Sequence, residues 1–264
     1  MKVYPNAPPP DRILHWDGCL NIRDLGGYPA THARRTRWRA LVRSDDLCRL
    51  TPDGRDAVVA YGIRTVIDIR FPSEVKQAIH PFSGFSADPN SPNYLNIPVN
   101  AGRDPARDGD LSGAFAGTCS RAAANRLELD ANRIGFARII SAIARARPGG
   151  VVVHCRAGHG RTGIAVALVL AVAGVPDQVI ADEYALSSES LDETYARWLA
   201  DQANVNAVEA EAFRRQAAAE PQAMLQTLDY VVGRYGSARD YLRGGGATPE
   251  DLDALIARLL EDPA

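Results

Sequence analysis

Ten residues near the middle of the chain, HCRAGHGRTG at 154–163, constrain its fold more than any other stretch. They follow GGVVV, a short β-branched run that indicates a buried strand. They lead into GIAVALVLAVAG, which is apolar on nearly all sides and predicts a buried helix closed by Gly174 and Pro176. The ten residues, called the signature loop below, therefore turn sharply from a strand into a helix.

Such a turn is suited to binding an anion, because the first N–H groups of a helix have no partner within the helix and carry the positive end of its dipole. Glycines at 158, 160 and 163 allow close backbone approach and positive φ angles, so that successive N–H groups converge. Arg161 can turn its planar guanidinium towards the same anion. We therefore expect a phosphate to be bound by Arg156, Ala157, Gly158, His159, Gly160 and Arg161.

Cys155 is predicted at the floor of this ring of positive partial charges, which favour its thiolate form and make it a nucleophile. Thr162 is placed to hydrogen-bond that thiolate. The spacing His-Cys-x5-Arg-Thr resembles the signature of cysteine-dependent phosphatases. The resemblance implies that Cys155 attacks a phosphate monoester, that a cysteinyl phosphate forms, and that water then hydrolyses it, with Arg161 and the loop amides stabilising the transferred group.

Other interpretations explain fewer of these residues. A structural buried cysteine explains neither the glycines nor Arg161. A metal site is disfavoured because His154, Cys155 and His159 have no second Cys/His pair at zinc spacing. A Walker loop needs Gly-Lys-Ser/Thr after the glycines. A rhodanese-type sulfur transferase also uses a loop cysteine, but an arginine at this spacing followed by threonine favours the phosphatase.

Composition sets the outer limits. The chain has 264 residues, a formal net charge of -2 and a pI of about 6.2, so nothing favours nucleic acid or stable membrane association. The basic run HARRTRWRALVR is local and is interpreted as a solvated hairpin face. Four cysteines without paired spacing and an N-terminus lacking a signal peptide predict a reduced, cytoplasmic protein. The oligomeric state is left open.

Strands that alternate with helices predict an α/β fold with a mainly parallel sheet flanked by helices and the signature loop at a strand's carboxyl end. The expected elements are a hairpin over 13–43, helices from Thr51 to Gly62 and from Pro72, strands at 65–69 and 94–99, a helix at 130–147, and helices after Gly174. An extended N-terminal arm is expected at 1–12 and a single domain at 13–264. The irregular segment at about 100–128 predicts a partly helical lid.

Further motifs carry a more specific resemblance: NIRDLGGY at 21–28, RSDDLCRLTPDG at 43–54 and DIR at 68–70. Together with the signature loop they resemble the bacterial tyrosine phosphatase family. This implies a phosphotyrosine phosphatase II-like fold with a lid, and dephosphorylation of phosphotyrosine, some members also acting on phosphoserine, phosphothreonine or phosphoinositides. No metal or organic cofactor is implied. Cys155 matches the family's nucleophile and Arg161 its phosphate-binding arginine.

The chain departs from this family at one place. Members commonly have Lys-Asp before the loop arginine, the Asp being a proposed acid and the Lys a contact to acidic lipid headgroups, where this chain has His159 and Gly160. A leaving phenolate needs a proton, so another acid is required. Asp104 is the first candidate, with Asp108 and Asp110 behind it; Asp68 is the alternative, and His159 is titratable near neutrality.

His154, Arg23 and Asp24 are expected around the loop rather than on the substrate. His154 orients the loop from the strand side, whereas Arg23 and Asp24 either pack beneath it or hold the hairpin. Loss of the loop lysine predicts weaker phosphoinositide activity than in relatives, with Arg156 as a substitute charge. The competing function is a phosphate-recognising protein that turns over poorly because the family acid is missing.

Overall fold

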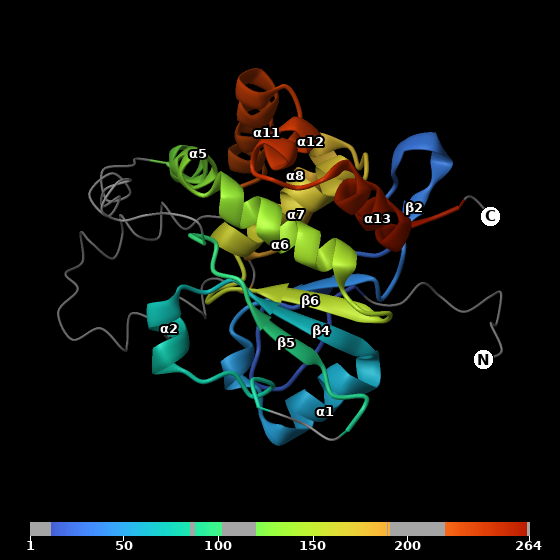
Figure 1. The fold of residues 1–264 in the computed structure, drawn as a ribbon, viewed down its shortest axis with the longest axis vertical. Helices are drawn as coiled ribbons and strands as arrows, with labels where there is room; N and C mark the ends of the chain where they lie inside the picture. The colour runs from blue at the N-terminus through green and yellow to red at the C-terminus, as the bar shows by residue number, and fades with distance from the viewer. Residues whose placement is uncertain (1–11, 85–87, 102–119, 189, 191–219, 263–264) are drawn as a thin grey trace.

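The computed structural model describes residues 12–84, 88–101, 120–188, 190 and 220–262. Its centre is a five-stranded sheet with helices on both faces (Figure 1). The strands run in the order β1 (Arg23–Asp24), β3 (Leu41–Ser44), β6 (Gly150–His154), β4 (Ile63–Asp68) and β5 (Asn93–Asn96). All neighbours pair in parallel except β1, which is antiparallel to β3. The predicted α/β fold with a mainly parallel sheet is confirmed.

The valine run before the signature loop contributes side chains to the hydrophobic core on each face of the sheet. Successive side chains of a strand point to opposite faces, and Val151 and Val153 join the larger core under the upper helices while Val152 joins the smaller one. All three are fully buried. A continuous apolar run is what a central parallel strand requires when helices cover both faces.

The smaller layer holds α1 (Pro52–Tyr61) and α2 (Pro72–Gln77) (Figure 1). The Thr51 side chain caps α1 by accepting from the Gly54 N–H, and Gly62 ends it at φ 98°. A cap of this kind and a left-handed glycine are local signals. Both ends of α1 therefore lie where the sequence predicted them.

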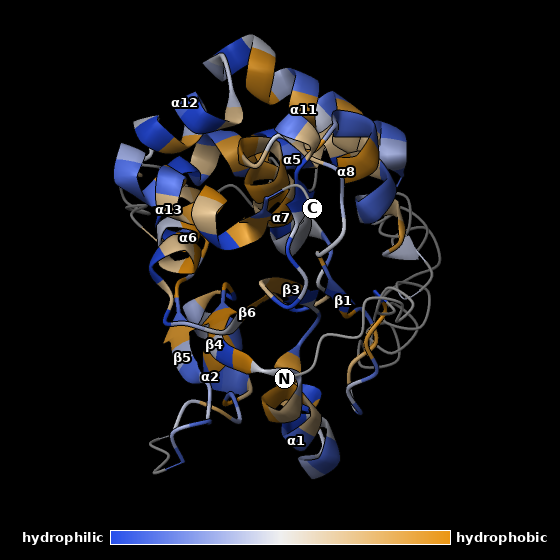
Figure 2. Ribbon diagram, turned by 90° about the vertical axis from the view of Figure 1, so that its right-hand side faces the viewer, coloured by the Kyte–Doolittle hydropathy of each residue, from blue (hydrophilic) through white to orange (hydrophobic). Residues whose placement is uncertain are grey.

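The larger layer is built around α7 (Gly160–Val172), whose side chains are buried almost throughout. Figure 2 shows this apolar helix inside the layer, with more hydrophilic helices such as α12 outside it. The layer also contains α5 (Arg121–Ala131), α6 (Arg133–Arg145), α8 (Asp177–Ala185), α11 (Pro221–Tyr235), α12 (Ala238–Gly244) and α13 (Pro249–Leu259). The buried helix predicted after the signature loop is confirmed, but it starts three residues earlier, within the loop itself.

The helix predicted over 130–147 begins later in the structure, at Arg133. The chain breaks at Asn132, whose φ of -122° and ψ of 26° leave the helical region, so α5 ends at Ala131 and α6 begins at Arg133. Beyond the break, Gly135 packs so closely on the Val99 carbonyl that a side chain could not fit. The break thus separates α5 from α6, and α6 packs against Val99 in the segment that follows β5.

The predicted hairpin over 13–43 exists as the antiparallel pair β1 and β3. Its excursion also carries β2 (Arg35–Thr36), which pairs with β7 (Leu260–Glu261) near the end of the chain. This second pairing was not predicted, because no local pattern reveals a partner more than two hundred residues away.

Two predicted segments fall largely outside the described residues. The arm at 1–12 is described only at residue 12, and residues 102–119 of the lid are not described. Residues 121–128 of the predicted lid form most of α5, which packs on α7 and α11. Among the described helices, none combines the length and apolarity that crossing a bilayer requires.

Candidate active site

The carboxyl ends of four parallel strands meet in one row beneath the signature loop. Ser44 of β3, His154 of β6, Asp68 of β4 and Asn96 of β5 are register partners from strand to strand. Ligands of open α/β sheets bind beyond such an edge. Cys155 follows His154 directly and is 3 % exposed.

The backbone of the signature loop turns its carbonyl groups outward. Four successive carbonyls, those of residues 155–158, accept hydrogen bonds from donors outside the loop's interior. The donors are His154 Nδ1 to Cys155 at 3.1 Å, the Asp46 N–H to Arg156 at 3.1 Å, Asn21 Nδ2 to Ala157 at 3.0 Å and Arg43 Nη2 to Gly158 at 2.5 Å. In a trans peptide the N–H points opposite to its carbonyl. The N–H groups of residues 156–159 therefore point into the loop, as a phosphate cradle requires.

The three loop glycines serve different purposes. Of these, only Gly158 has a positive φ, at 66°, and a side chain there would collide with the Ser44 carbonyl. Gly160 and Gly163 lie in α7 with ordinary φ angles, which corrects the expectation that all three supply unusual backbone conformations. Gly163 instead allows close packing, because a Cβ would come within 2.7 Å of the Tyr184 ring.

Arg161 and Thr162 lie in the first turn of α7. Arg161 makes a two-point ion pair with Glu74 of α2, with Nη1 at 2.5 Å from Oε2 and Nη2 at 2.9 Å from Oε1. Burial disfavours its charge, but the bonds to Glu74 and the nearby Cys155 raise the pKa of Arg161 overall. Thr162 is fully buried, and its hydroxyl has no hydrogen-bond partner among the described residues. The predicted bond from Thr162 to the Cys155 sulfur is therefore not formed in this structure, and the roles of both residues stay predictions.

A cluster of three buried charges, called the loop-side cluster, supports the loop from below. It consists of Arg23 of β1, Arg43 of β3 and Glu183 of α8. Arg23 Nε lies 3.0 Å from Glu183 Oε1, and Arg43 Nη1 lies 2.6 Å from Glu183 Oε2. Burial and the adjacent Arg43 lower the pKa of Arg23, whereas the two arginines, against the effect of burial, hold the pKa of Glu183 below its usual range. Arg23 thus reaches the loop only through a partner, since Asn21, which accepts from Arg23, donates to the Ala157 carbonyl.

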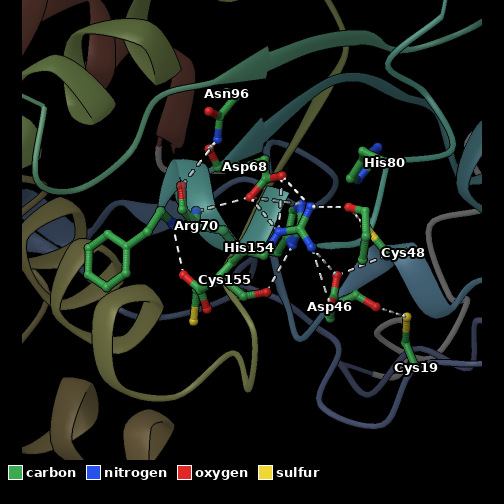
Figure 3. Close-up of polar contacts among 12 residues, drawn as sticks. Cys19, Asp46, Cys48, Asp68, Arg70, His80, Asn96, His154 and Cys155 are labelled. Carbon is green, nitrogen blue, oxygen red and sulfur yellow. Dashed lines mark hydrogen bonds and ion pairs between the residues drawn. The ribbon is translucent and has the colours of Figure 1, made fainter. Parts of the chain in front are cut away.

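A second cluster, called the strand-side cluster, lies at the end of β4 and consists of Asp68, Arg70 and Asp46 (Figure 3). Arg70 Nη2 lies 2.8 Å from Asp68 Oδ2, and the Tyr94 hydroxyl donates to the same oxygen at 2.9 Å. Burial alone would raise the pKa of Asp68, but the hydrogen bonds from Arg70 outweigh it and the pKa is about 2. A carboxyl with this pKa carries no proton at neutral pH, which argues against Asp68 as the general acid.

His154 connects the strand-side cluster to the loop. Its ring is fully buried, with Nδ1 on the Cys155 carbonyl and Nε2 3.8 Å from Asp68 Oδ1 (Figure 3). Burial lowers the pKa of His154, and it lowers that of the neighbouring His80 to about 2. A neutral His154 that donates to the carbonyl fits its predicted role of orienting the loop.

His159 does not face the substrate entrance. It is 1 % exposed, and its ring lies 4.7 Å from that of Tyr184 in α8. Burial, reinforced by the positive charge of Arg121, keeps the pKa of His159 well below its ordinary value. A neutral, enclosed imidazole is a poor proton donor at neutral pH, so the geometry argues against His159 as the acid.

The remaining predicted residues have different outcomes. Asp24 accepts from the N–H groups of Gly26 and Arg39 and from the Tyr61 hydroxyl, so it holds the hairpin rather than the loop. Asp104 lies outside the described residues.

Several residues that hold the loop carried no assigned role in the sequence, among them Arg43, Glu74 and Glu183. Arg43 was part of a recognised motif, but nothing in the pattern showed that it reaches the Gly158 carbonyl. Glu74 and Glu183 lie on short helical patterns typical of solvated faces, and each is paired with an arginine distant in sequence. The only available signal was the Pro72-to-Glu74 spacing, which is typical of a helix start.

The fold and the site define a class. A thiol at the end of a central parallel strand, inside a ring of inward N–H groups and beside an arginine on the following helix, is the arrangement of a cysteine-dependent phosphatase. The model of the tyrosine phosphatase family matches residues 14–261. The chain belongs to that family and is a phosphatase of the protein-tyrosine class.

Individual relatives agree with this assignment. A tyrosine-protein phosphatase of Nostoc commune is 30 % identical over 239 residues, covering 88 % of this chain and 78 % of the relative. The triple specificity protein phosphatase PtpB of Mycobacterium tuberculosis is 29 % identical over 202 residues, covering 68 % of this chain and 71 % of PtpB. A putative tyrosine-protein phosphatase of Cupriavidus necator is 28 % identical over 195 residues, covering 71 % of this chain and 69 % of the relative.

Proposed function

We propose that the protein hydrolyses phosphotyrosine in protein substrates with Cys155 as the nucleophile. The Cys155 thiolate attacks phosphorus, the bond from phosphorus to the phenolic oxygen breaks, and a cysteinyl phosphate forms. Water then attacks phosphorus, releasing inorganic phosphate and the thiolate. The observation that carries this proposal is the outward turn of four successive loop carbonyls, which aims the N–H groups of residues 156–159 at one centre above a buried thiol.

Arg161 and Thr162 are assigned supporting roles in this reaction. Arg161 binds two equatorial oxygens of the transferred group and stabilises the charge on them. The Thr162 hydroxyl is buried and has no hydrogen-bond partner among the described residues, and we assign to it donation to the thiolate, which eases departure of the thiolate when water attacks the intermediate.

We assign the general acid to Asp104, which protonates the leaving phenolate. The chain leaves β5 beside the loop, because the N–H groups of Ile97 and Val99 bond to the carbonyls of Asp68 and Ile69 at the end of β4. The last described residues before Asp104 therefore lie beside the strand ends beneath the loop. The ion-paired Asp68 and the enclosed His159 are weaker candidates on the geometry given above.

The substrate range is proposed to be narrower than that of the triple specificity relative. The loop position of the family lysine is taken by His159, which is buried, and the next position by Gly160, which has no side chain. Arg156 is exposed and is the remaining loop cation able to meet an acidic headgroup. We expect turnover of phosphoinositides to be well below that of phosphotyrosine peptides. Equal rates on the two substrates would contradict this.

The test is a pH–rate profile on a phosphotyrosine peptide for the native protein and for Cys155→Ser, Asp104→Asn and Asp68→Asn. We expect Cys155→Ser to be inactive, Asp104→Asn to lose the basic limb of the profile, and Asp68→Asn to retain it. An active Cys155→Ser variant would overturn the nucleophile assignment.

An aryl phosphate with a good leaving group separates the enzyme from a phosphate-recognising protein with weak turnover. Such a substrate scarcely needs an acid. The observation behind this alternative is the absence of the family's acid at Gly160. Hydrolysis of the aryl phosphate with failure on phosphotyrosine peptides would favour the alternative.

A further inference from the structure

The start of α2 lies against the loop arginine. Glu74 Oε2 accepts the Phe71 N–H at 2.8 Å, which closes the first turn of α2, and the same oxygen accepts from Arg161 Nη1. The Glu74 side chain is therefore oriented by its own helix as well as by the guanidinium. This one carboxylate connects α2 and α7, which are far apart in the sequence.

Phe71 contacts the same guanidinium from a second direction. The Arg161 Cζ lies 4.5 Å from the centroid of the Phe71 ring, within the range of a cation–π contact. A ring face and a two-point ion pair together restrict both the tilt and the rotation of a planar group. The side chains of Arg161 and Glu74 are 14 % and 17 % exposed, so solvent screens this pair only in part.

The backbone that leads into α2 is fixed as well. Arg70, which immediately precedes Phe71, is held by Asp68 and Asp46 of the strand-side cluster. The Asn96 side chain also donates to the Arg70 carbonyl, at 3.3 Å. The segment carrying Phe71 and Glu74 is thus anchored to the strand ends of β4 and β5.

Electrostatics give Glu74 a clear purpose. Arg161 is a cation in the first turn of a helix, where the dipole disfavours positive charge. Helix stability therefore does not explain its place, and Glu74 offsets the cost while no anion is bound. A carboxylate that competed with phosphate for Arg161 would inhibit the enzyme. The geometry of the ion pair shows whether Arg161 can bind Glu74 and phosphate at the same time.

The guanidinium can bind both anions at once. It has five N–H bonds, and Glu74 uses the end formed by Nη1 and Nη2. The adjacent edge, formed by Nε and the second hydrogen of Nη2, makes no hydrogen bond to the described residues and can form a two-point contact to phosphate oxygens.

We propose that Glu74 and Phe71 are positioning residues, which hold the Arg161 guanidinium in the plane that binds the transferred phosphoryl group. This proposal rests on the proposed function, because it assigns the two residues a purpose only in phosphoryl transfer. Neither residue touches the substrate. Their effect on the reaction passes entirely through Arg161.

The experiment measures kcat and KM on an aryl phosphate and the Kd of inorganic phosphate, for Glu74→Ala, Glu74→Gln, Phe71→Leu and Phe71→Tyr. Displacement of a reacting group by a small distance costs about a hundredfold, so we expect Glu74→Ala to lower kcat roughly tenfold to a hundredfold. KM should change little. Glu74→Gln keeps one acceptor and should fall between Glu74→Ala and the native protein, and Phe71→Tyr keeps the ring and should rescue the loss seen in Phe71→Leu.

Two controls make the outcome specific. Lys76→Ala changes an exposed residue of the same helix and should leave kcat unchanged. In the Arg161→Ala background, Glu74→Ala should have no further effect on kcat, because non-additivity is expected when one residue acts through another. Thermal unfolding of each variant reports whether it folds.

The proposal is overturned if folded Glu74→Ala keeps the native kcat, if its loss adds fully to that of Arg161→Ala, or if it binds phosphate more tightly and turns over faster. The last result would mean that Glu74 competes with the anion. Failure of the proposed function looks different: Cys155→Ser or Arg161→Ala would then hydrolyse the aryl phosphate as well as the native protein does.

Discussion

The loop-side and strand-side clusters lie at the same edge of the sheet, and each is built from three charged residues. The loop-side cluster contains two arginines and one glutamate, leaving one net positive charge, and all three side chains are nearly inaccessible. The strand-side cluster contains one arginine and two aspartates, leaving one net negative charge, and the Asp46 side chain is 15 % exposed. The clusters therefore have opposite charge balance and different access to solvent.

This difference indicates how the sheet edge is divided between binding and support. The surplus positive charge touches the loop directly, since Arg43 donates to the Gly158 carbonyl, and it favours an anion in the cradle. The surplus negative charge lies in a cluster in which Asp46 is 15 % exposed, so solvent screens it in part, and it lies next to a histidine kept neutral by burial. The loop-side cluster thus acts on the site electrostatically, whereas the strand-side cluster holds β4, β5 and α2 together and contacts the loop through the Asp46 N–H, which donates to the Arg156 carbonyl.

The largest expected effect comes from removing the single anion of the loop-side cluster. Arg23 and Arg43 are register partners on adjacent strands, so Glu183→Ala leaves two buried like charges facing each other. Breaking a buried ion pair in this way costs about 3–5 kcal/mol of unfolding free energy. Urea unfolding measures the loss, with the exposed Asp182→Ala on the same helix as control. A loss below about 1 kcal/mol, the range of a surface ion pair, would show that the cluster needs no internal balance.

A smaller effect is expected in the strand-side cluster, where Arg70 keeps a second partner. Asp68→Asn should reduce the unfolding free energy by about 1.5–3 kcal/mol, the usual range for hydrogen bonds to charged groups, because Asp46 still pairs with Arg70. Its pH–rate profile should keep the basic limb. If that limb disappeared while the fold stayed intact, Asp68 would be the acid after all and the division between the clusters would fail.

The strand-side cluster also predicts an acid dependence of stability. The pKa of Asp68 is about 2 in the folded chain, below its unfolded value of about 3.9. Its contribution is therefore complete above the unfolded pKa and is lost as pH falls through the folded one. The difference in unfolding free energy between the native protein and Asp68→Asn should be constant near neutrality and shrink between about pH 4 and pH 2. A difference independent of pH in this window would contradict the assignment.

The smallest effect is expected at the edge of the same cluster. Tyr94→Phe removes one hydrogen bond to Asp68 and keeps the ring that stacks on His80. The unfolding free energy should fall by about 0.5–1.5 kcal/mol, the usual worth of one such bond, with kcat unchanged. A marked loss of kcat would mean that the strand-side cluster controls the chemistry as well as the fold.

The two clusters also show where sequence reasoning succeeded and where it could not. The strand, the signature loop and α7 were predictable because β-branched residues, glycines and an apolar run act over a few neighbouring positions. The ends of α1 were predictable for the same reason, through Thr51 and Gly62. Local signals thus gave the loop and the elements beside it.

Contacts between distant segments were not predictable. Glu183 and Arg43 are 140 positions apart, and Glu74 and Arg161 are 87 apart, yet each pair stabilises the loop. Each residue has an ordinary neighbourhood in the sequence, and only the fold reveals its partner. Asp68 is an example, since its position at a strand end was predicted but its ion pair with Arg70, which argues against it as the acid, was not.

The central claim is that Cys155 forms a covalent bond to phosphorus, and rapid quenching tests it most directly. The native protein is mixed with an aryl phosphate, and the reaction is stopped in acid within a single turnover. The protein is then digested, and the masses of its peptides are measured by mass spectrometry. The account predicts the added mass of one phosphoryl group on the peptide that contains Cys155, and no such species in Cys155→Ser. Turnover with no phosphorylated peptide, or with the group on another residue, would contradict it.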